Sequence, residues 1–135
     1  MNFVKEDIEN YCKNHSPEDT PLLKNLAEYT KKNIEGSAML SGPLVGSILQ
    51  SIICMIQAKK ILEIGMYTGY SALKMLEVLP DNGTIDTCEL GDNHCKTARS
   101  FFNKASKGGQ IKIHKGEALK SIEKFSDNSF DFIFI

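Results

Sequence analysis

The chain has 135 residues, of which 41% are hydrophobic, with 16 lysines and arginines against 17 aspartates and glutamates. This composition predicts one globular domain and excludes wholesale disorder. Because the charges balance, we expect no nucleic-acid partner and no polybasic membrane anchor. The longest apolar run, residues 44–56, is expected to be too short and too polar to span a bilayer. Four cysteines without a close pair, and an acidic N-terminus, predict a reduced, cytoplasmic protein.

The N-terminal part of the chain is expected to be helical. A short helix is predicted over residues 3–14. Ser16 and Pro17, followed by two acids, indicate the start of a second helix, which Gly36 would end. A third helix is predicted from about residue 43 to 57. It is apolar on most faces, which is typical of a helix buried against a sheet.

From Lys60 onward, strand and helix patterns alternate. This alternation predicts an α/β fold with a doubly wound parallel sheet, preceded by the N-terminal helices. We expect one domain, with helices in residues 1–58 and ligand-binding βα units in residues 59–135. The predicted strands are residues 61–64, 84–89, 110–114 and 130–135, and the predicted helices are residues 70–79, 92–106 and 117–125. An open parallel sheet needs a layer on both faces, so the domain is expected to be incomplete at its C-terminus.

A glycine turn follows the first predicted strand. Doubly wound folds bind ligands beyond the carboxyl ends of their strands. Gly65 and Gly69 would let the backbone turn sharply and lie close to a ligand. Ser71 stands near the start of the next helix, where N–H groups favour a carboxylate. The alternative is that both glycines only form a tight strand-to-helix turn.

Two acids flank this turn. Glu63 lies within an apolar strand and needs a partner, either a ligand ammonium group or a lysine such as Lys59 or Lys60. Glu89 ends the second strand, roughly 20 residues beyond the turn, where an acid can accept hydrogen bonds from both ribose hydroxyls. Alternatively, Glu89 is an ordinary loop acid.

The turn favours S-adenosylmethionine over a dinucleotide. A dinucleotide pyrophosphate calls for G-x-G-x-x-G, and Tyr67 stands where the second of those glycines would be. S-adenosylmethionine has no phosphate, and the looser turn suits it better. An NAD-dependent oxidoreductase is the less favoured alternative.

Residues 61–71, ILEIGMYTGYS, resemble the first motif of the cation-dependent O-methyltransferases, the caffeoyl-coenzyme A and catechol O-methyltransferase group. The resemblance continues through residues 79–83, the strand ending at Glu89, and residues 115–119 and 130–135. It implies a Rossmann-like class I methyltransferase fold with its first four strands in the order 3-2-1-4. It also implies methyl transfer from S-adenosylmethionine to a hydroxyl of a small aromatic, catechol- or caffeoyl-like acceptor.

Carried over by position, the resemblance assigns most cofactor contacts to the glycine turn and its flanks. It implies that Glu63 and Ser71 hold the amino and carboxylate ends of the methionine moiety. The backbone of Gly65 and Met66 would lie against the cofactor, and Glu89 would bind the ribose.

Two further cofactor contacts are implied outside the turn. Ala118 would lie by the adenine. Ser41 would flank the methionine moiety, although Val45 stands where this family usually has Glu or Gln.

The family's metal ligands lie directly after the strand that matches residues 130–135, and in a later Asp-Asn pair. The resemblance therefore implies a divalent ion, usually magnesium, in the complete enzyme, and predicts that residues 1–135 alone are inactive. Because the apolar strand 130–135 would be uncovered, these residues alone are also expected to be poorly soluble. Asp131 is expected inside the strand and is no substitute ligand. Family members are often homodimers. The alternative from another class is a non-catalytic cofactor-binding or interaction module of the same fold.

Overall fold

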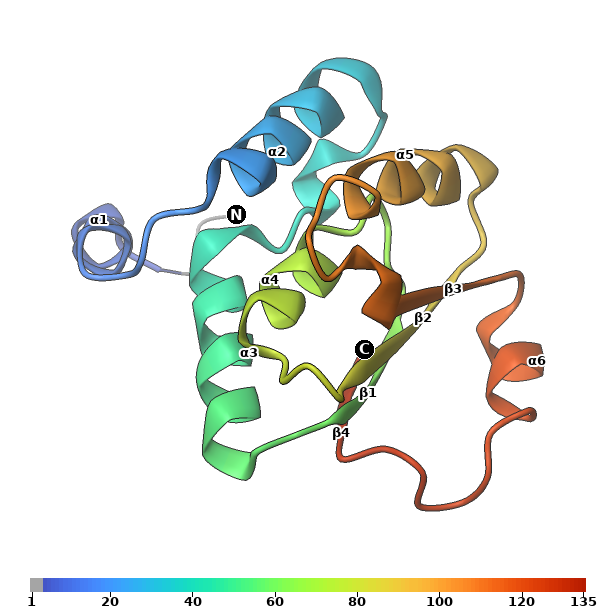
Figure 1. The fold of residues 1–135 in the computed structure, drawn as a ribbon. Coiled ribbons are helices and arrows are strands. Elements are labelled where there is room, and N and C mark those ends of the chain that lie inside the picture. The colour runs from blue at the N-terminus through green and yellow to red at the C-terminus, as the bar shows by residue number, and fades with distance from the viewer. Residues whose placement is uncertain (1–3) are drawn as a thin grey trace.

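The computed structural model describes residues 4–135. Helices come first, and strands alternate with helices from residue 60 onward (Figure 1). The N-terminal elements are α1 (Glu6–Asn14), α2 (Pro21–Asn33), the 3-10 turn η1 (Ser37–Met39) and α3 (Gly42–Ile56). The remaining elements are β1 (Lys60–Ile64), α4 (Tyr70–Val78), β2 (Thr84–Glu89), α5 (Asp92–Phe102), η2 (Gly108–Gln110), β3 (Ile111–Lys115), α6 (Ala118–Ile122) and β4 (Phe132–Phe134).

The four strands form one parallel sheet in the order β3-β2-β1-β4, which confirms the predicted topology. The register aligns Glu63 of β1 with Thr87 of β2 and Phe134 of β4, so these three side chains point to the same face. In Figure 1, α3 and α4 lie on one side of the sheet and α6 lies on the other. This arrangement is the doubly wound α/β fold that the sequence predicts.

Helix α4 is the centre of the core. Every residue from position 70 to 76 is buried, including Lys74, because the helix lies between the sheet and the N-terminal helices. Leu26 of α2, Ile53 of α3 and Ile85 of β2 belong to the same buried cluster. Each such side chain contributes roughly 1.5–3 kcal/mol when removed from water. The start of α4, directly after the glycine turn, is thus firmly fixed.

The predicted start of the second helix was wrong by four residues. Helix α2 begins at Pro21 rather than Pro17, with Thr20 as its N-cap. Asp19 is instead drawn to α4, where it accepts a hydrogen bond from the Tyr70 hydroxyl (2.6 Å) and pairs with Lys74 (3.2 Å). These long-range contacts keep the segment before Pro21 extended.

Other element ends also differ from the prediction. Gly36 has a left-handed backbone (φ +79°), but it lies three residues beyond the end of α2. Helix α5 ends at Phe102 rather than residue 106, because the chain turns back so closely that a Cβ at Gly108 would lie 1.8 Å from the Phe102 carbonyl oxygen. The last helix and strand are shorter than expected. The first predicted helix is observed as α1, and residue 3 lies outside the described residues.

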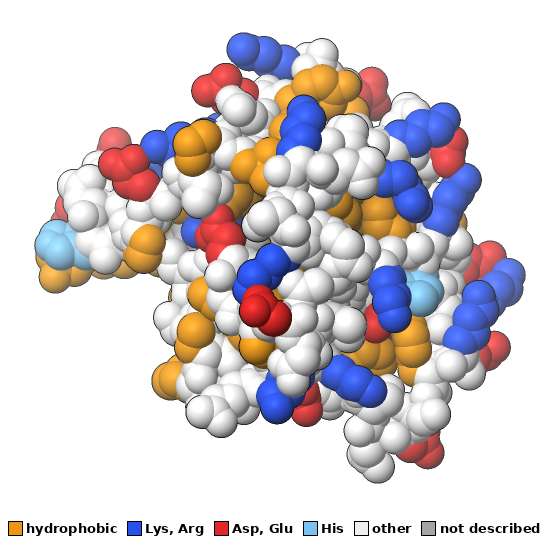
Figure 2. All heavy atoms as spheres, viewed as in Figure 1, with side chains coloured by type: hydrophobic (Ala, Val, Ile, Leu, Met, Phe, Trp, Pro, Cys, Tyr) orange, Lys and Arg blue, Asp and Glu red, His pale blue; other side chains and the backbone are white. Residues whose placement is uncertain are grey.

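Helix α3 is less buried than predicted. Only Gly46, Leu49 and Ile53 are buried, whereas Met55 is 75% exposed. By length and composition alone, Ser37–Ile56 is apolar enough to cross a membrane, contrary to the expectation from residues 44–56. Mostly buried core helices meet the same criterion, but only 17% of this window is buried, although α3 packs against α4. On the face shown in Figure 2, acidic and basic side chains are interspersed with hydrophobic ones.

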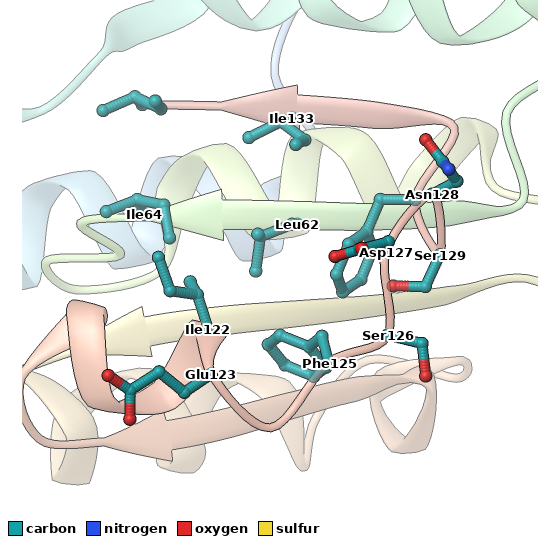
Figure 3. A pocket seen from close by; sticks show the side chains of 12 residues that line it. Leu62, Ile64, Ile122, Glu123, Phe125, Ser126, Asp127, Asn128, Ser129 and Ile133 are labelled. Carbon is teal, nitrogen blue, oxygen red and sulfur yellow. The ribbon is translucent and has the colours of Figure 1, made fainter.

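The face of the sheet that points away from α3 and α4 carries an open apolar cavity of about 620 Å³ (Figure 3). Leu62 and Ile64 of β1 and Ile133 of β4 form its floor, and Ile122 and Phe125 approach from α6 and the loop after it. Within residues 4–135, this loop and α6 are the elements outside the sheet that border the cavity. The β4 side of this face is therefore open to solvent.

Candidate functional site

The two glycines of the turn have different surroundings. Both have positive φ angles, +89° at Gly65 and +91° at Gly69. A Cβ at Gly65 would meet nothing within 4 Å, whereas one at Gly69 would lie 2.7 Å from the Phe102 ring. Gly69 therefore lets α5 pack closely, and Gly65 leaves open space in front of the backbone. The turn-only interpretation fits Gly69, and the ligand interpretation fits Gly65.

The turn is held against the end of β2. The N–H groups of Gly65 and Met66 both donate to the Cys88 carbonyl, at 3.0 and 3.2 Å. The side chain of Met66 is buried in the core, so only its backbone can face a ligand. Consequently the ends of β1 and β2 form one continuous edge.

Tyr67 has a left-handed backbone (φ +52°), which is unusual for a bulky residue and costs on the order of 1–3 kcal/mol. Its N–H donates to Glu89 Oε2 at 2.7 Å, and its hydroxyl donates to the Glu35 carbonyl at 2.8 Å. The strained turn is thus fixed both by the acid that ends β2 and by the segment after α2.

Glu63 is fully buried, and its carboxylate accepts two short hydrogen bonds. The Ser71 hydroxyl donates to Oε1 and the Thr87 hydroxyl donates to Oε2, both at 2.5 Å. Burial raises the pKa of Glu63 to about 7, although the two hydroxyls act to lower it and the charge of Glu89 raises it further.

The proposed lysine partners of Glu63 were wrong. The backbone N–H groups of Lys59 and Lys60 bind the Asp131 carboxylate instead, both at 2.8 Å. Asp131 precedes β4 rather than lying within it, and these bonds hold its pKa below the usual range. It pins the amino ends of β1 and β4, at the edge opposite the glycine turn.

The sequence analysis missed Thr87. Strand periodicity places Thr87 and Glu89 on one face of β2, and the parallel register brings Thr87 beside Glu63. Ser71 is nearly buried, and its hydroxyl is occupied by Glu63. Ser71 therefore supports that carboxylate in this structure.

Glu89 lies at the carboxyl end of β2 and is bound from three sides. Oε2 accepts the Tyr67 N–H, and Oε1 accepts the Gly91 N–H at 2.7 Å. The third contact is His94 Nδ1, 3.1 Å from Oε1. The Glu89 carboxylate is thus held in place beside the glycine turn, unlike the side chain of an ordinary loop acid.

The last two predicted residues lie in different places. The Gly116 N–H donates to the Glu89 carbonyl at 2.9 Å, which brings Ala118, at the start of α6, to the same edge of the sheet. Ser41 precedes α3. Among the described residues, no hydrogen bond joins Ser41 to the other predicted contacts.

No three His, Cys, Asp or Glu side chains within residues 4–135 gather as metal ligands. The arrangement at the sheet edge instead suits an organic ligand. It offers open space at Gly65, a carboxylate that can accept hydroxyl groups at Glu89, and a buried carboxylate behind the turn at Glu63. These features fit a nucleoside that carries a cationic amino acid.

Comparisons with known proteins give a family match and several relatives. Residues 13–135 match the family described as O-methyltransferase. Caffeoyl-CoA O-methyltransferase 2 of Zea mays is 34% identical over 124 residues, covering 88% of this chain and 47% of that protein.

Two solved structures have a similar fold. A Podospora anserina methyltransferase, described as SAH-bound, superposes with a TM-score of 0.86 at 28% identity, covering 98% of this chain and 58% of that one. A Bacillus cereus O-methyltransferase in complex with SAH gives a TM-score of 0.83 at 28% identity, covering 96% of this chain and 60% of that one. The chain therefore spans about half to three fifths of the length of these relatives.

Proposed function

Because this chain belongs to the O-methyltransferase family, we propose that it binds S-adenosylmethionine at the glycine turn and Glu89. We propose further that the whole protein transfers the methyl group to a hydroxyl of a small aromatic acceptor, catechol- or caffeoyl-like. The Zea mays relative, which is named for caffeoyl-CoA, supports this acceptor class.

One observation carries the cofactor proposal. The open backbone at Gly65 and the carboxylate of Glu89 share one edge, where the N–H of Tyr67, two residues after Gly65, donates to Glu89 Oε2 at 2.7 Å. A carboxylate there can accept the ribose hydroxyls, while the open backbone lets a ligand approach closely. Glu63 lies buried behind the turn, and its ionised form favours the cationic end of the ligand.

The residues of this chain would bind and orient the cofactor. S-adenosylmethionine supplies an electrophilic methyl group when it is bound. The acceptor hydroxyl must lose its proton as it attacks, and a divalent ion, as the family resemblance implies, would lower the hydroxyl pKa. We assign none of the side chains of residues 4–135 to the coordination of that ion.

The cofactor proposal is tested by calorimetry on the full natural chain with S-adenosylhomocysteine, and with NAD as the comparison ligand. Glu89→Ala should weaken S-adenosylhomocysteine binding by about tenfold or more, because it removes a charged acceptor of hydrogen bonds. Glu123→Ala, an exposed acid on the cavity face, is the matched control and should bind like the wild type. Unchanged affinity in Glu89→Ala, or tighter binding of NAD, would contradict the assignment.

The acceptor proposal needs a separate assay. The full natural chain is incubated with S-adenosylmethionine and either catechol or caffeoyl-CoA, with magnesium or with a chelator. We expect methylation that depends on the metal. Binding of S-adenosylhomocysteine without turnover of any hydroxylated aromatic would favour the non-catalytic binding module.

A further inference from the structure

His94 contributes the side-chain contact to the Glu89 carboxylate, whose other two donors are backbone N–H groups. His94 Nδ1 lies 3.1 Å from Oε1, where a protonated Nδ1 donates to the carboxylate. The contacts from Tyr67 and Gly91 are made by their backbone N–H groups. The sequence analysis gave His94 no role.

The ring of His94 is fixed between the two loops of the candidate site. It stands edge-on to the Tyr67 ring, with centroids 4.7 Å apart and planes at 70°. A Cβ at Gly91 would lie 2.5 Å from Nδ1, so the imidazole covers the backbone of Gly91. The ring thus touches the glycine turn after β1 and the loop after β2 at the same time.

This placement has a chemical consequence for Glu89. A carboxylate offers about four lone-pair sites, two on each oxygen. Donors from His94 and Gly91 occupy both sites on Oε1, and the donor from Tyr67 occupies one on Oε2, so one acceptor site is left, on Oε2. Without the imidazole, Oε1 keeps one donor, and the carboxylate can rotate away from the ribose.

We propose that His94 is a positioning residue that holds the Glu89 carboxylate so that Oε2 faces a ribose hydroxyl of the cofactor. This inference rests on the proposed function, since it needs an adenosyl cofactor at Glu89. His94 acts through Glu89 and is not assigned a contact with the reacting groups.

The structure offers a matched control on the other face of the sheet. His114 Nε2 lies 2.7 Å from Asp86 Oδ1, also in a histidine–carboxylate pair. Both histidine side chains are 26% exposed, and the acids Glu89 and Asp86 are 11% and 14% exposed. Loss of His114 should therefore disturb the fold about as much as loss of His94, without touching the candidate site.

The test is calorimetric titration of the full natural chain with S-adenosylhomocysteine. His94→Ala should weaken binding about tenfold, the size expected for one hydrogen bond to a charged group. His94→Asn, whose amide nitrogen can replace Nδ1, should restore most of the affinity. His114→Ala should bind within about twofold of the wild type. In a Glu89→Ala background, His94→Ala should cause no further loss.

Several outcomes would overturn the role of His94. They are wild-type affinity in His94→Ala, no recovery in His94→Asn, an equal loss in His114→Ala, or the same tenfold loss in the Glu89→Ala background. The last result would mean that the ring acts by packing on Tyr67 alone. Failure of the wild type to bind S-adenosylhomocysteine would instead contradict the proposed function and remove the basis for the inference.

Discussion

Replacing Glu63 by glutamine should stabilise the fold near pH 8 far more than near pH 5. The carboxyl has an ordinary pKa of 4.5 in the unfolded chain and a pKa of about 7 in the folded one. Between these values the folded state holds the proton more tightly, so the stability of the wild type falls as the pH rises through this window. Above pH 7 the full difference between the two pKa values of Glu63 lowers the free energy of unfolding by about 3 kcal/mol, relative to low pH where the carboxyl is protonated in both states.

Glutamine keeps the shape of the side chain but cannot ionise. Its carbonyl can accept one hydroxyl and its amide can donate to the other, so Ser71 and Thr87 stay paired. Any change in those bonds adds a constant to the free energy of unfolding at every pH. The difference in stability between the Glu63→Gln variant and the wild type should therefore grow by about 2–3 kcal/mol from pH 5 to pH 8.

The assay is urea unfolding of both proteins at the two pH values, with extrapolation to water. Other titrating groups cancel in the difference between variant and wild type. Glu123→Gln, at an exposed acid, should show no such growth. If the Glu63→Gln difference is the same at pH 5 and pH 8, Glu63 is not the buried titrating group described here. The variant should also bind S-adenosylhomocysteine less tightly, because the charge behind the glycine turn is gone.

Further predictions concern the same site and the open cavity. Thr87→Val removes one donor from Glu63, so urea unfolding should show a larger loss of stability at pH 8 than at pH 5, and an equal loss would contradict this. Gly69→Ala should lower the melting temperature more than Gly65→Ala, because only the former meets an aromatic ring of α5. For ligand binding we expect the reverse order: calorimetry should show weaker S-adenosylhomocysteine binding in Gly65→Ala than in Gly69→Ala. Residues 1–135 should self-associate through the exposed β4 face, and Ile133→Lys should reduce this on size-exclusion chromatography; a monomeric wild type would contradict it.

The strands could be predicted from the sequence because their signals are local. β2 was predicted with its observed bounds, and β1 to within one residue, because short apolar runs between turn residues are typical of buried strands. The start of α2 could not be predicted in this way. Ser16 and Pro17 form a good local start signal, but Asp19 is drawn to Lys74, far along the chain. Long-range ion pairs have no local pattern.

The positions of the candidate residues could be predicted, whereas their contacts could not. The motif placed Glu63, Gly65 and Glu89 at or near the carboxyl ends of β1 and β2, where the structure has them, and their binding of a cofactor stays a prediction. That Glu63 binds Ser71 and Thr87 rather than a lysine depends on the strand register and on the angle of α4. The sequence could not distinguish the roles of Gly69 and Gly65, because the difference is that α5 packs over Gly69 while the space beside Gly65 is open.

Helix α4 joins the N-terminal helices to the candidate site. Its first residue, Tyr70, donates to Asp19, and its next, Ser71, donates to Glu63. One turn later, the buried ammonium of Lys74 pairs with Asp19. Removing one partner of a buried ion pair typically costs about 3–5 kcal/mol, because a charge stays buried alone. Residues before β1 therefore stabilise the very helix start that supports the glycine turn, which argues that the helices and the βα units act as one structural unit.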